Sequence, residues 1–376
     1  MDIGLFYQIQ VPKPWSTDSE SKRYWEMLEE VTYAEEIGMT SVWFVEHHFR
    51  SEWSHSSAPD ITLAAISQRT TKMRLGIAVV LVPLHHPLNI ASRMATLDVV
   101  SNGRVDLGIG RSGYPYQMMP YGSDLKDVSG MLEEYLKIIP GAWTEEEFSF
   151  EGQYYHIPPR EVVPKPVQKP LPIMVGGMGE RRTLKIVAEL ADEWNSLGVT
   201  IDDYKHKTEV LKGHCAAVGR DPCGIKHSQM SGFIVGKDDQ GIRRHLVNIG
   251  RKLKSDAIVG SMTADPSNVL AEARTRGWLV GTPSQLVDEL GKREEAGISR
   301  VMLQHHANHR TVKFRRPPLQ THDPKHLSNL HFPTKPPGAK YSRDPFYQNR
   351  YRAFSSCPQR LLPSCGFLPQ APRRLR

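Results

Sequence analysis

The chain has 376 residues, of which 24% are charged and 39% hydrophobic, and its formal net charge is +7. This length gives one large domain or two ordinary ones, with enough chain to bury a substantial core. No apolar run approaches the ~20 residues of a membrane span, and no secretory signal pattern follows Met1, so we expect neither a membrane protein nor a secreted one. The four cysteines form no CxxC pair, which predicts a cytoplasmic protein and gives little support to structural zinc.

The positive charge is concentrated at the C-terminal end of the chain. Residues 311–376 contain 13 Lys+Arg, 2 Asp+Glu and 11 of the 28 prolines. Their net charge is +11, so the first 310 residues carry −4 of the total of +7. We interpret the chain as a domain over 1–310 and a basic, Pro-rich tail over 311–376, whose composition is typical of disorder or of an unrelated reading frame. Nucleic-acid binding through the tail has only electrostatics behind it, so we expect no nucleic-acid partner.

The first 310 residues alternate strand-like and helix-like segments. Apolar, β-favouring runs predict strands, and apolar residues at helical spacing predict the helices between them. In chain order the predicted strands are 3–10, 41–47, 73–82, 104–112, 172–177, 193–197, 229–236 and 300–305. The predicted helices are 19–37, 59–70, 87–100, 126–143, 180–191, 202–218 and 283–296, the last with Thr282 as its N-cap.

Two segments do not follow this alternation. Residues 148–172 combine alternating aromatic residues with several prolines, which predicts a hairpin or an excursion loop. Residues 237–277 show only weak periodicity. No helical pattern follows the last strand either, so the final closing helix is predicted to be missing.

The order of the elements predicts the fold class. Apolar strands separated by amphipathic helices indicate a parallel sheet that is covered on its outer face. Eight such units in about 310 residues favour an α/β (β/α)₈ TIM barrel over an open doubly wound sheet, for which six would suffice.

In a barrel of this class the functional residues lie at the C-terminal ends of the strands. The clearest candidate is the turn 176–181, because a glycine-rich turn before a helix exposes N–H groups that suit a phosphate. Arg111, Arg181 or Arg182 would add charge-assisted hydrogen bonds. A plain tight turn between a strand and a helix is the alternative.

His47 and His48 follow the second strand and have three interpretations. They are metal ligands, a general acid/base pair, or packed histidines, and Glu46 beside them fits a two-histidine, one-carboxylate metal site. Adjacent strand residues point to opposite faces, so only one of the two can face the barrel mouth. No HxD or HxH spacing occurs here, so we favour a single histidine that donates or accepts a proton, and we predict no metal.

Five motifs together resemble the bacterial luciferase-like flavin-dependent oxidoreductases. They occur in the expected order over about residues 1–305: SVWFVEHHF, LGIAVVLVPLHHP, SNGRVDLGIGRSGY, PIMVGGMGERRTLKIVAELADEW and VGTPSQLVDEL. The resemblance implies a (β/α)₈ barrel that binds reduced FMN or the deazaflavin coenzyme F420 at the C-terminal strand ends. In the monooxygenase branch reduced flavin and O₂ oxygenate a substrate, whereas the F420 branch transfers hydride without O₂. The family commonly dimerises, so a homodimer is expected.

The resemblance also assigns roles to individual residues. His47 matches the active-site histidine beside the flavin ring, and Gly110 stands where luciferase itself has a reactive cysteine. Ser129 stands where many members have a phosphate-binding arginine. The resemblance further assigns a non-proline cis peptide behind the ring to Ala78–Val79, phosphate binding to Arg111, a flavin contact to Tyr114, and the phosphate turn to Gly177, Met178 and Gly179, with Arg181 beside it.

The motifs leave the choice of cofactor open between two branches. EHHF and SHSSAP resemble FMN-type members, whereas MVGGMGERRT, GRDP and VMLQHH resemble members often assigned to F420. We favour a monooxygenase that takes reduced FMN from a separate flavin reductase and acts with O₂ on a small-molecule substrate. The alternatives are an F420-dependent hydride-transfer enzyme and a non-catalytic flavin-binding barrel.

Overall fold

A computed structural model describes residues 1–111, 114–123, 127–253, 259–260 and 263–306 of the chain. Eight parallel strands close into a barrel, with β1 pairing to β11 on one side and β8 pairing to β9 on the other. This confirms the predicted TIM barrel. The barrel strands are β1 (Asp2–Tyr7), β2 (Ser41–Phe44), β3 (Arg74–Leu81), β4 (Val105–Gly110), β7 (Ile173–Gly176), β8 (Glu193–Ser196), β9 (Lys226–Val235) and β11 (Arg300–His305).

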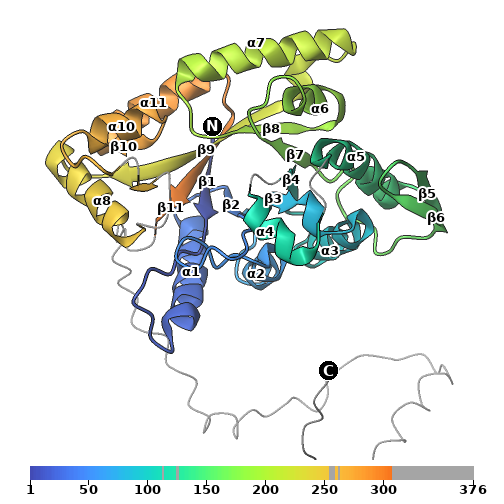
Figure 1. Cartoon of the computed structure of the whole chain (residues 1–376), viewed down its shortest axis with the longest axis horizontal. Helices are drawn as coiled ribbons and strands as arrows, with labels where there is room; N and C mark the ends of the chain where they lie inside the picture. Colours follow the sequence, from blue (N-terminus) through green and yellow to red (C-terminus); the bar gives the residue numbers. More distant parts are fainter. Residues whose placement is uncertain (112–113, 124–126, 254–258, 261–262, 307–376) are drawn as a thin grey trace, which may run out of the picture. The chain divides into compact units, whose positions relative to one another are not determined.

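Helices surround the barrel on its outer side (Figure 1). Several begin at the capping signals that the sequence contains: the Thr282 side chain accepts a hydrogen bond from the Gln285 N–H, with Pro283 in the first turn. The helices are α1 (Ser19–Glu36), α2 (Pro59–Ser67), α3 (Pro87–Val100), α4 (Pro115–Met118), α5 (Val128–Thr144), α6 (Thr183–Leu190), α7 (Ile201–Ala217), α8 (Asp239–Lys252), α10 (Val269–Thr275) and α11 (Pro283–Glu295). Short 3₁₀ turns are η1 (Val82–Leu84), η2 (Met119–Tyr121) and η3 (Pro222–Gly224).

The structure corrects the sequence prediction in three places. Among its described residues, the weakly patterned stretch 237–277 contains the helices α8 and α10. A short strand that we missed, β10 (Leu279–Gly281), pairs with the C-terminal end of β9. Between β4 and α5 the chain also forms α4 and η2, both too short to show a period. The predicted hairpin over 148–172 is confirmed as the antiparallel pair β5 (Phe148–Glu151) and β6 (His156–Arg160).

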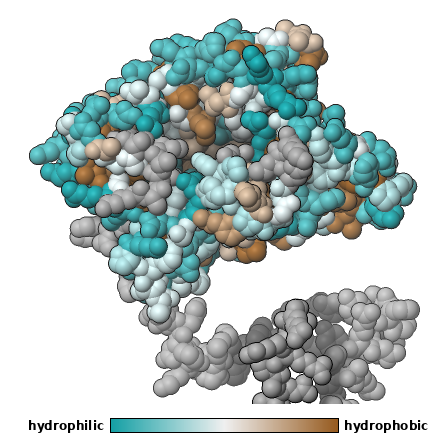
Figure 2. Space-filling model, viewed as in Figure 1, coloured by the Kyte–Doolittle hydropathy of each residue, from teal (hydrophilic) through white to brown (hydrophobic). Residues whose placement is uncertain are grey.

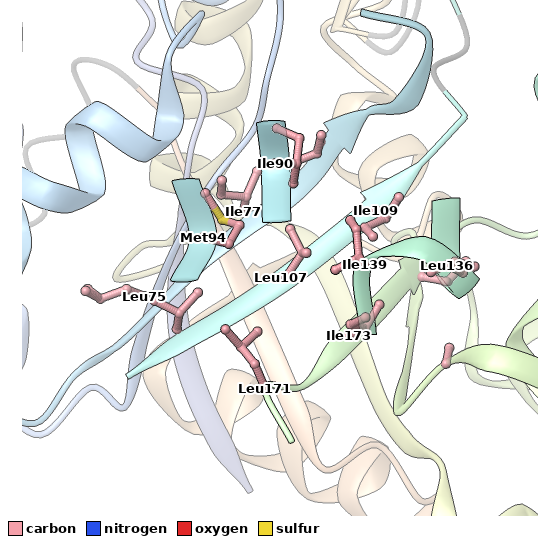
Figure 3. Close-up of a cluster of buried hydrophobic side chains, with 14 of the residues drawn as sticks. Leu75, Ile77, Ile90, Met94, Leu107, Ile109, Leu136, Ile139, Leu171 and Ile173 are labelled. Carbon is pink, nitrogen blue, oxygen red and sulfur yellow. The ribbon is translucent and has the colours of Figure 1, made fainter. Parts of the chain in front are cut away.

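The main hydrophobic core lies between the barrel and its helices. Figure 3 shows side chains of β3, β4 and β7 meeting those of α3 and α5. Each fully buried Leu or Ile in this layer stabilises the fold by about 1.5–3 kcal/mol. The labelled residues are Leu75, Ile77, Ile90, Met94, Leu107, Ile109, Leu136, Ile139, Leu171 and Ile173.

Buried charges fill the N-terminal end of the barrel interior. The guanidinium of Arg300, 2% exposed, lies 2.8 Å from a Glu193 oxygen and 3.5 Å from an Asp106 oxygen. Arg74 binds the same Asp106 carboxylate at 2.5 Å. Burial raises the pKa of Glu193, and the charge of Arg300 opposes that rise. Because this charged layer fills the N-terminal end of the barrel interior, we expect a ligand to enter from the C-terminal end of the strands.

A hydrophobic layer lies above these charges, and we call it the barrel floor. It consists of Phe6, Trp43, Val45, Met174 and Met302, with Ala78, Val79 and Met230 packed against it. Phe6 and Trp43 are therefore core residues of the barrel interior. The barrel mouth is therefore apolar at its base, and polar residues surround it at the C-terminal ends of the strands.

The predicted tail 311–376, the division at residue 310 and the missing closing helix lie outside the described residues. Within the described part of the chain, no helix is long and apolar enough to cross a membrane. Figure 2 shows that the viewed face is mostly hydrophilic, with hydrophobic residues in separate small patches.

Candidate active site

The base of the site is the Ala78–Val79 segment of β3. The peptide bond between these residues is cis, as the family resemblance implied. The pairing register of β3 with β4 shifts between Ile77 and Val80, so the strand departs from regular geometry at this point. The Val79 side chain occupies the space that a Cβ would need at Gly110 or Gly176, with would-be contacts of 2.5 Å and 3.0 Å. Because Gly110 on β4 and Gly176 on β7 have no side chain, Val79 can pack into the barrel floor between them.

His47 lies at the mouth beside the segment that follows β4. Its Nδ1 is 3.2 Å from the Gln117 Oε1, and its ring makes an edge contact with Tyr114 at 6.1 Å between centroids. The Gln117 oxygen also accepts the His48 N–H at 2.8 Å. Because this oxygen is an acceptor, Nδ1 of His47 is the donor, which leaves Nε2 with the lone pair.

The electrostatic surroundings keep the His47 ring neutral. Burial and then the charge of Arg50 lower the pKa of His47 to about 4. The guanidinium of Arg50 lies over the Tyr114 ring at 5.0 Å and over the Trp53 ring at 5.4 Å. A neutral imidazole at physiological pH can accept a proton at Nε2 and return it.

Glu46 and His48 make contacts of their own beyond the end of β2, where strand alternation does not apply. The buried Glu46 carboxylate accepts the Leu81 N–H at 2.9 Å, His48 Nε2 at 3.0 Å and His85 Nε2 at 2.6 Å. Burial alone would raise the pKa of Glu46, but the hydrogen bonds from His48 and then His85 lower it to about 2. The hydroxyl of Tyr121 lies 2.9 Å from His48 Nδ1.

Through these hydrogen bonds, the Glu46 carboxylate connects the ends of neighbouring strands, and its oxygens are engaged with protein donors. It joins the loop after β2 to the end of β3, and Tyr121 adds η2 to the same set. Across the described residues, no three His, Cys, Asp or Glu side chains are arranged to hold a metal ion.

The predicted phosphate turn lines a cleft of about 440 Å³ between β4 and β7. Gly177 has φ of 139°, which favours glycine, and its carbonyl accepts the Trp194 indole N–H at 2.8 Å. A Cβ at Gly179 would lie 3.0 Å from Thr183 Oγ1, so the backbone passes close to the start of α6. The residues lining the cleft are Arg111, Met178, Gly179, Glu180, Arg181, Arg182, Thr183 and Lys207.

Ser129 contributes to this cleft in a way that the sequence did not predict. Its hydroxyl accepts a hydrogen bond from Arg111 Nη1 at 3.2 Å, and its side chain is buried. The serine therefore supports Arg111. Arg182 pairs with Asp127 at 3.2 Å, and Lys207 pairs with Glu180, so part of the positive charge is already balanced.

The cleft fits a phosphate group. Glycine backbone, a threonine hydroxyl and an arginine converge at the positive end of α6, which is the usual protein environment of a phosphate. The structure thus brings Arg111, Met178, Gly179 and Arg181 together, and it places Ala78, Val79 and Gly110 together at the floor. His47 and Tyr114 form the third group, and Gly177 shapes the turn.

Sequence inspection missed Gln117 and Lys207. Gln117 lies in a short helix without periodicity, and Lys207 lies on α7, two elements away from the turn it faces. For the other buried polar side chains at the barrel mouth, the sequence contained one signal: Gln8 and Gln10 alternate with apolar residues after the first strand.

Comparisons with known proteins identify the family of the chain. The model of the luciferase-like monooxygenase family matches residues 1–300. The oxygenase component of flavin-dependent trigonelline monooxygenase from Acinetobacter baylyi is 31% identical over 174 residues, which is 46% of this chain and 47% of that protein. The F420-dependent glucose-6-phosphate dehydrogenase of Amycolatopsis mediterranei is 30% identical over 161 residues, 41% of this chain and 48% of that protein. The chain thus spans about half the length of the curated relatives it matches.

A solved structure supports the fold. The monooxygenase RslO1 from Streptomyces bottropensis superposes with a TM-score of 0.71 at 24% identity, covering 81% of this chain and 92% of that one.

Proposed function

Because this chain belongs to the luciferase-like monooxygenase family, we propose that it is the oxygenase component of a flavin-dependent monooxygenase that uses reduced FMN and O₂. A separate flavin reductase would supply the reduced FMN. The similarity to a protein named as an oxygenase component supports this partner. The cytoplasmic location and the homodimer stay predictions.

The observation that carries the proposal is the position of three groups at one end of the barrel. The cis Ala78–Val79 segment provides an apolar surface, the cleft at Arg111 and Gly179 suits a phosphate, and His47 lies beside the mouth. Gly110 contacts Val79 and immediately precedes Arg111, so the floor and the phosphate cleft are continuous along the chain. This arrangement suits a flat ring joined to a phosphate by a flexible chain.

Reduced FMN would supply the electrons with which O₂ is activated. The protein's own contribution is binding, orientation and proton handling. Arg111 and the N–H groups at Gly179 and Thr183 would hold the phosphate, and Val79 would support one face of the ring. Neutral His47 would accept or return a proton at Nε2, while the buried charge layer around Arg300 closes the opposite end to water.

One observation favours the second candidate, an F420-dependent hydride-transfer enzyme. Four cationic side chains line the phosphate cleft, namely Arg111, Arg181, Arg182 and Lys207. That is more positive charge than one terminal phosphate needs, although Asp127 and Glu180 balance two of them. A ligand with further anionic groups beyond its phosphate would use this surplus.

The reaction of the bound cofactor with O₂ tests the proposal. The protein is loaded with FMNH₂ without oxygen, mixed rapidly with O₂, and followed by flavin absorbance. We expect a reoxidation rate that saturates with protein and differs at least severalfold from that of free FMNH₂. Reoxidation identical to that of free FMNH₂ would remove the monooxygenase assignment, and hydride transfer to or from F420 would support the alternative.

A further inference from the structure

Four buried polar atoms at the barrel mouth have no hydrogen-bond partner among the described residues. They are Gln8 Oε1, Trp53 Nε1, Gln117 Nε2 and Gln304 Nε2. Gln8 and Gln304 are each only 5% exposed, so surrounding water has little access to them. An unpartnered buried group of this kind costs about 1–3 kcal/mol, and such atoms at a functional end of a barrel indicate a ligand that completes them.

Gln8 and Gln304 lie at the C-terminal ends of the neighbouring strands β1 and β11, near the barrel floor. Strands β1 and β11 pair in parallel with Phe6 opposite Gln304. Alternation places Gln8 on the same face as Phe6, and Gln304 on the same face as Met302, and both Phe6 and Met302 belong to the floor. Both amides therefore face the barrel interior next to the apolar floor.

Trp53 lies on the same side of the mouth. Its ring is 6.4 Å from that of His306, which is two residues beyond Gln304. The His306 Nδ1 is 3.4 Å from Nε2 of Gln10, three residues after the end of β1. The side chains of β1, of β11 and of the loop after β2 thus meet here. Together they present two unpartnered N–H donors, from Gln304 and Trp53, and one unpartnered acceptor, from Gln8.

This group lies across the barrel from the phosphate cleft. In the closed order of strands, β1 and β11 are four positions away from β7 and β4, respectively. Strands of an eight-stranded barrel that face each other are roughly 15 Å apart. A phosphate, a ribityl chain and a three-ring system can together span such a distance.

We propose that Gln8, Gln304 and Trp53 bind the pyrimidinedione edge of the flavin ring. That neutral edge presents two carbonyl oxygens and an N–H between them, which complements two donors and one acceptor. Donation from Gln304 and Trp53 to the carbonyls, with acceptance by Gln8 from N3–H, leaves none of these atoms unpaired. The inference rests on the proposed function but not on the choice of cofactor, because FMN and F420 carry the same edge.

Flavin binding to Gln8→Leu and Gln304→Leu variants tests this assignment. Each substitution keeps the side-chain volume and removes the unpartnered atom, so the flavin-free protein should not lose thermal stability. Affinity for FMN, measured by fluorescence quenching, should fall about 10-fold in each variant. Gln10→Leu is the matched control, since that buried amide lies two residues from Gln8 and already has a partner in His306.

A methylated flavin isolates the contact with Gln8. Wild-type protein should bind 3-methyl-FMN about 10-fold more weakly than FMN, because the N3–H donor is missing. The Gln8→Leu variant should bind the two flavins equally. The same measurements are made with F420 if that is the cofactor that binds.

The two proposals fail in different ways. If wild-type protein binds neither FMN nor F420, the proposed function fails and this assignment fails with it. If wild-type protein binds a flavin while both variants bind it equally well, only the assignment is overturned, and the amides then serve another ligand such as the substrate. Lower thermal stability in both variants would also overturn it, because the amides would then be structural.

Discussion

Substituting Gly110 with alanine tests whether Val79 is held against β4 as the structure shows. A Cβ on Gly110 would lie 2.5 Å from Cγ2 and 3.2 Å from Cβ of Val79, whereas ordinary carbon contacts begin near 3.4 Å. Gly110 is not among the glycines with positive φ, so the expected penalty is steric rather than conformational. Overpacking of this size costs about 1–3 kcal/mol, which corresponds to a fall in Tm of roughly 2–6 °C. Displacing Val79 would also disturb the floor and weaken flavin binding.

A second substitution makes this prediction specific. Val79→Ala removes the 2.5 Å contact and leaves one of 3.2 Å, which a shift of a few tenths of an ångström relieves. The double variant should therefore recover more than half of the stability that Gly110→Ala loses, with a coupling of about 1 kcal/mol or more. Gly213→Ala on α7, where a Cβ would meet nothing within 4 Å, should stabilise the protein slightly. Calorimetry of the four variants tests the predicted contact between Gly110 and Val79. An unchanged Tm in Gly110→Ala, or a Tm in the double variant no higher than that of Gly110→Ala, would contradict it.

Three further predictions concern His47 and the phosphate cleft. His47→Ala should leave flavin affinity nearly intact and slow turnover about 100-fold, as steady-state kinetics would show; unchanged turnover would remove its role in proton transfer. Arg50→Gln should raise the pKa of His47 from about 4 towards 6.5 in an NMR titration. The pKa of His47 is lower in the folded protein than in the unfolded chain, so the free energy of unfolding of wild-type protein should fall as the pH falls from about 6.5 to 4. The Arg50→Gln variant should lose less stability over this pH range. Arg111→Ala should weaken FMN binding at least 10-fold and riboflavin binding little, with Ser129→Ala showing a smaller effect of the same kind; equal losses for both flavins would contradict the phosphate assignment.

The barrel was predictable because local patterns determine most of its parts. The strand 73–82 and the helix 87–100 appear almost as expected, since an apolar run and a proline at the helix start are local signals. The alternation rule does not apply to His47 and His48, because both residues follow the end of β2 at Phe44. The motifs also located the cis bond at Ala78–Val79, through the family resemblance rather than through any local signal.

The remaining features depend on contacts between residues far apart in the chain. Ser129 supports Arg111 from 18 positions away, and the hydrogen bond exists only because β4 and α5 meet at the cleft. Helix α8 is different, because its buried residues Ile242, Leu246 and Ile249 stand at helical spacing, so the sequence did contain its pattern and our prediction overlooked it. The unpartnered amides of Gln8 and Gln304 become evident only when closure of the barrel brings the first and last strands together.

The central claim is that this barrel mouth binds reduced FMN. The most direct test is an anaerobic titration of the full chain with FMNH₂ and, in parallel, with reduced F420, followed by calorimetry and fluorescence. Our account predicts saturable binding of FMNH₂ at one site per chain, tighter than that of F420 and weakened by Arg111→Ala. Binding of reduced F420 alone, or of neither cofactor, would contradict it.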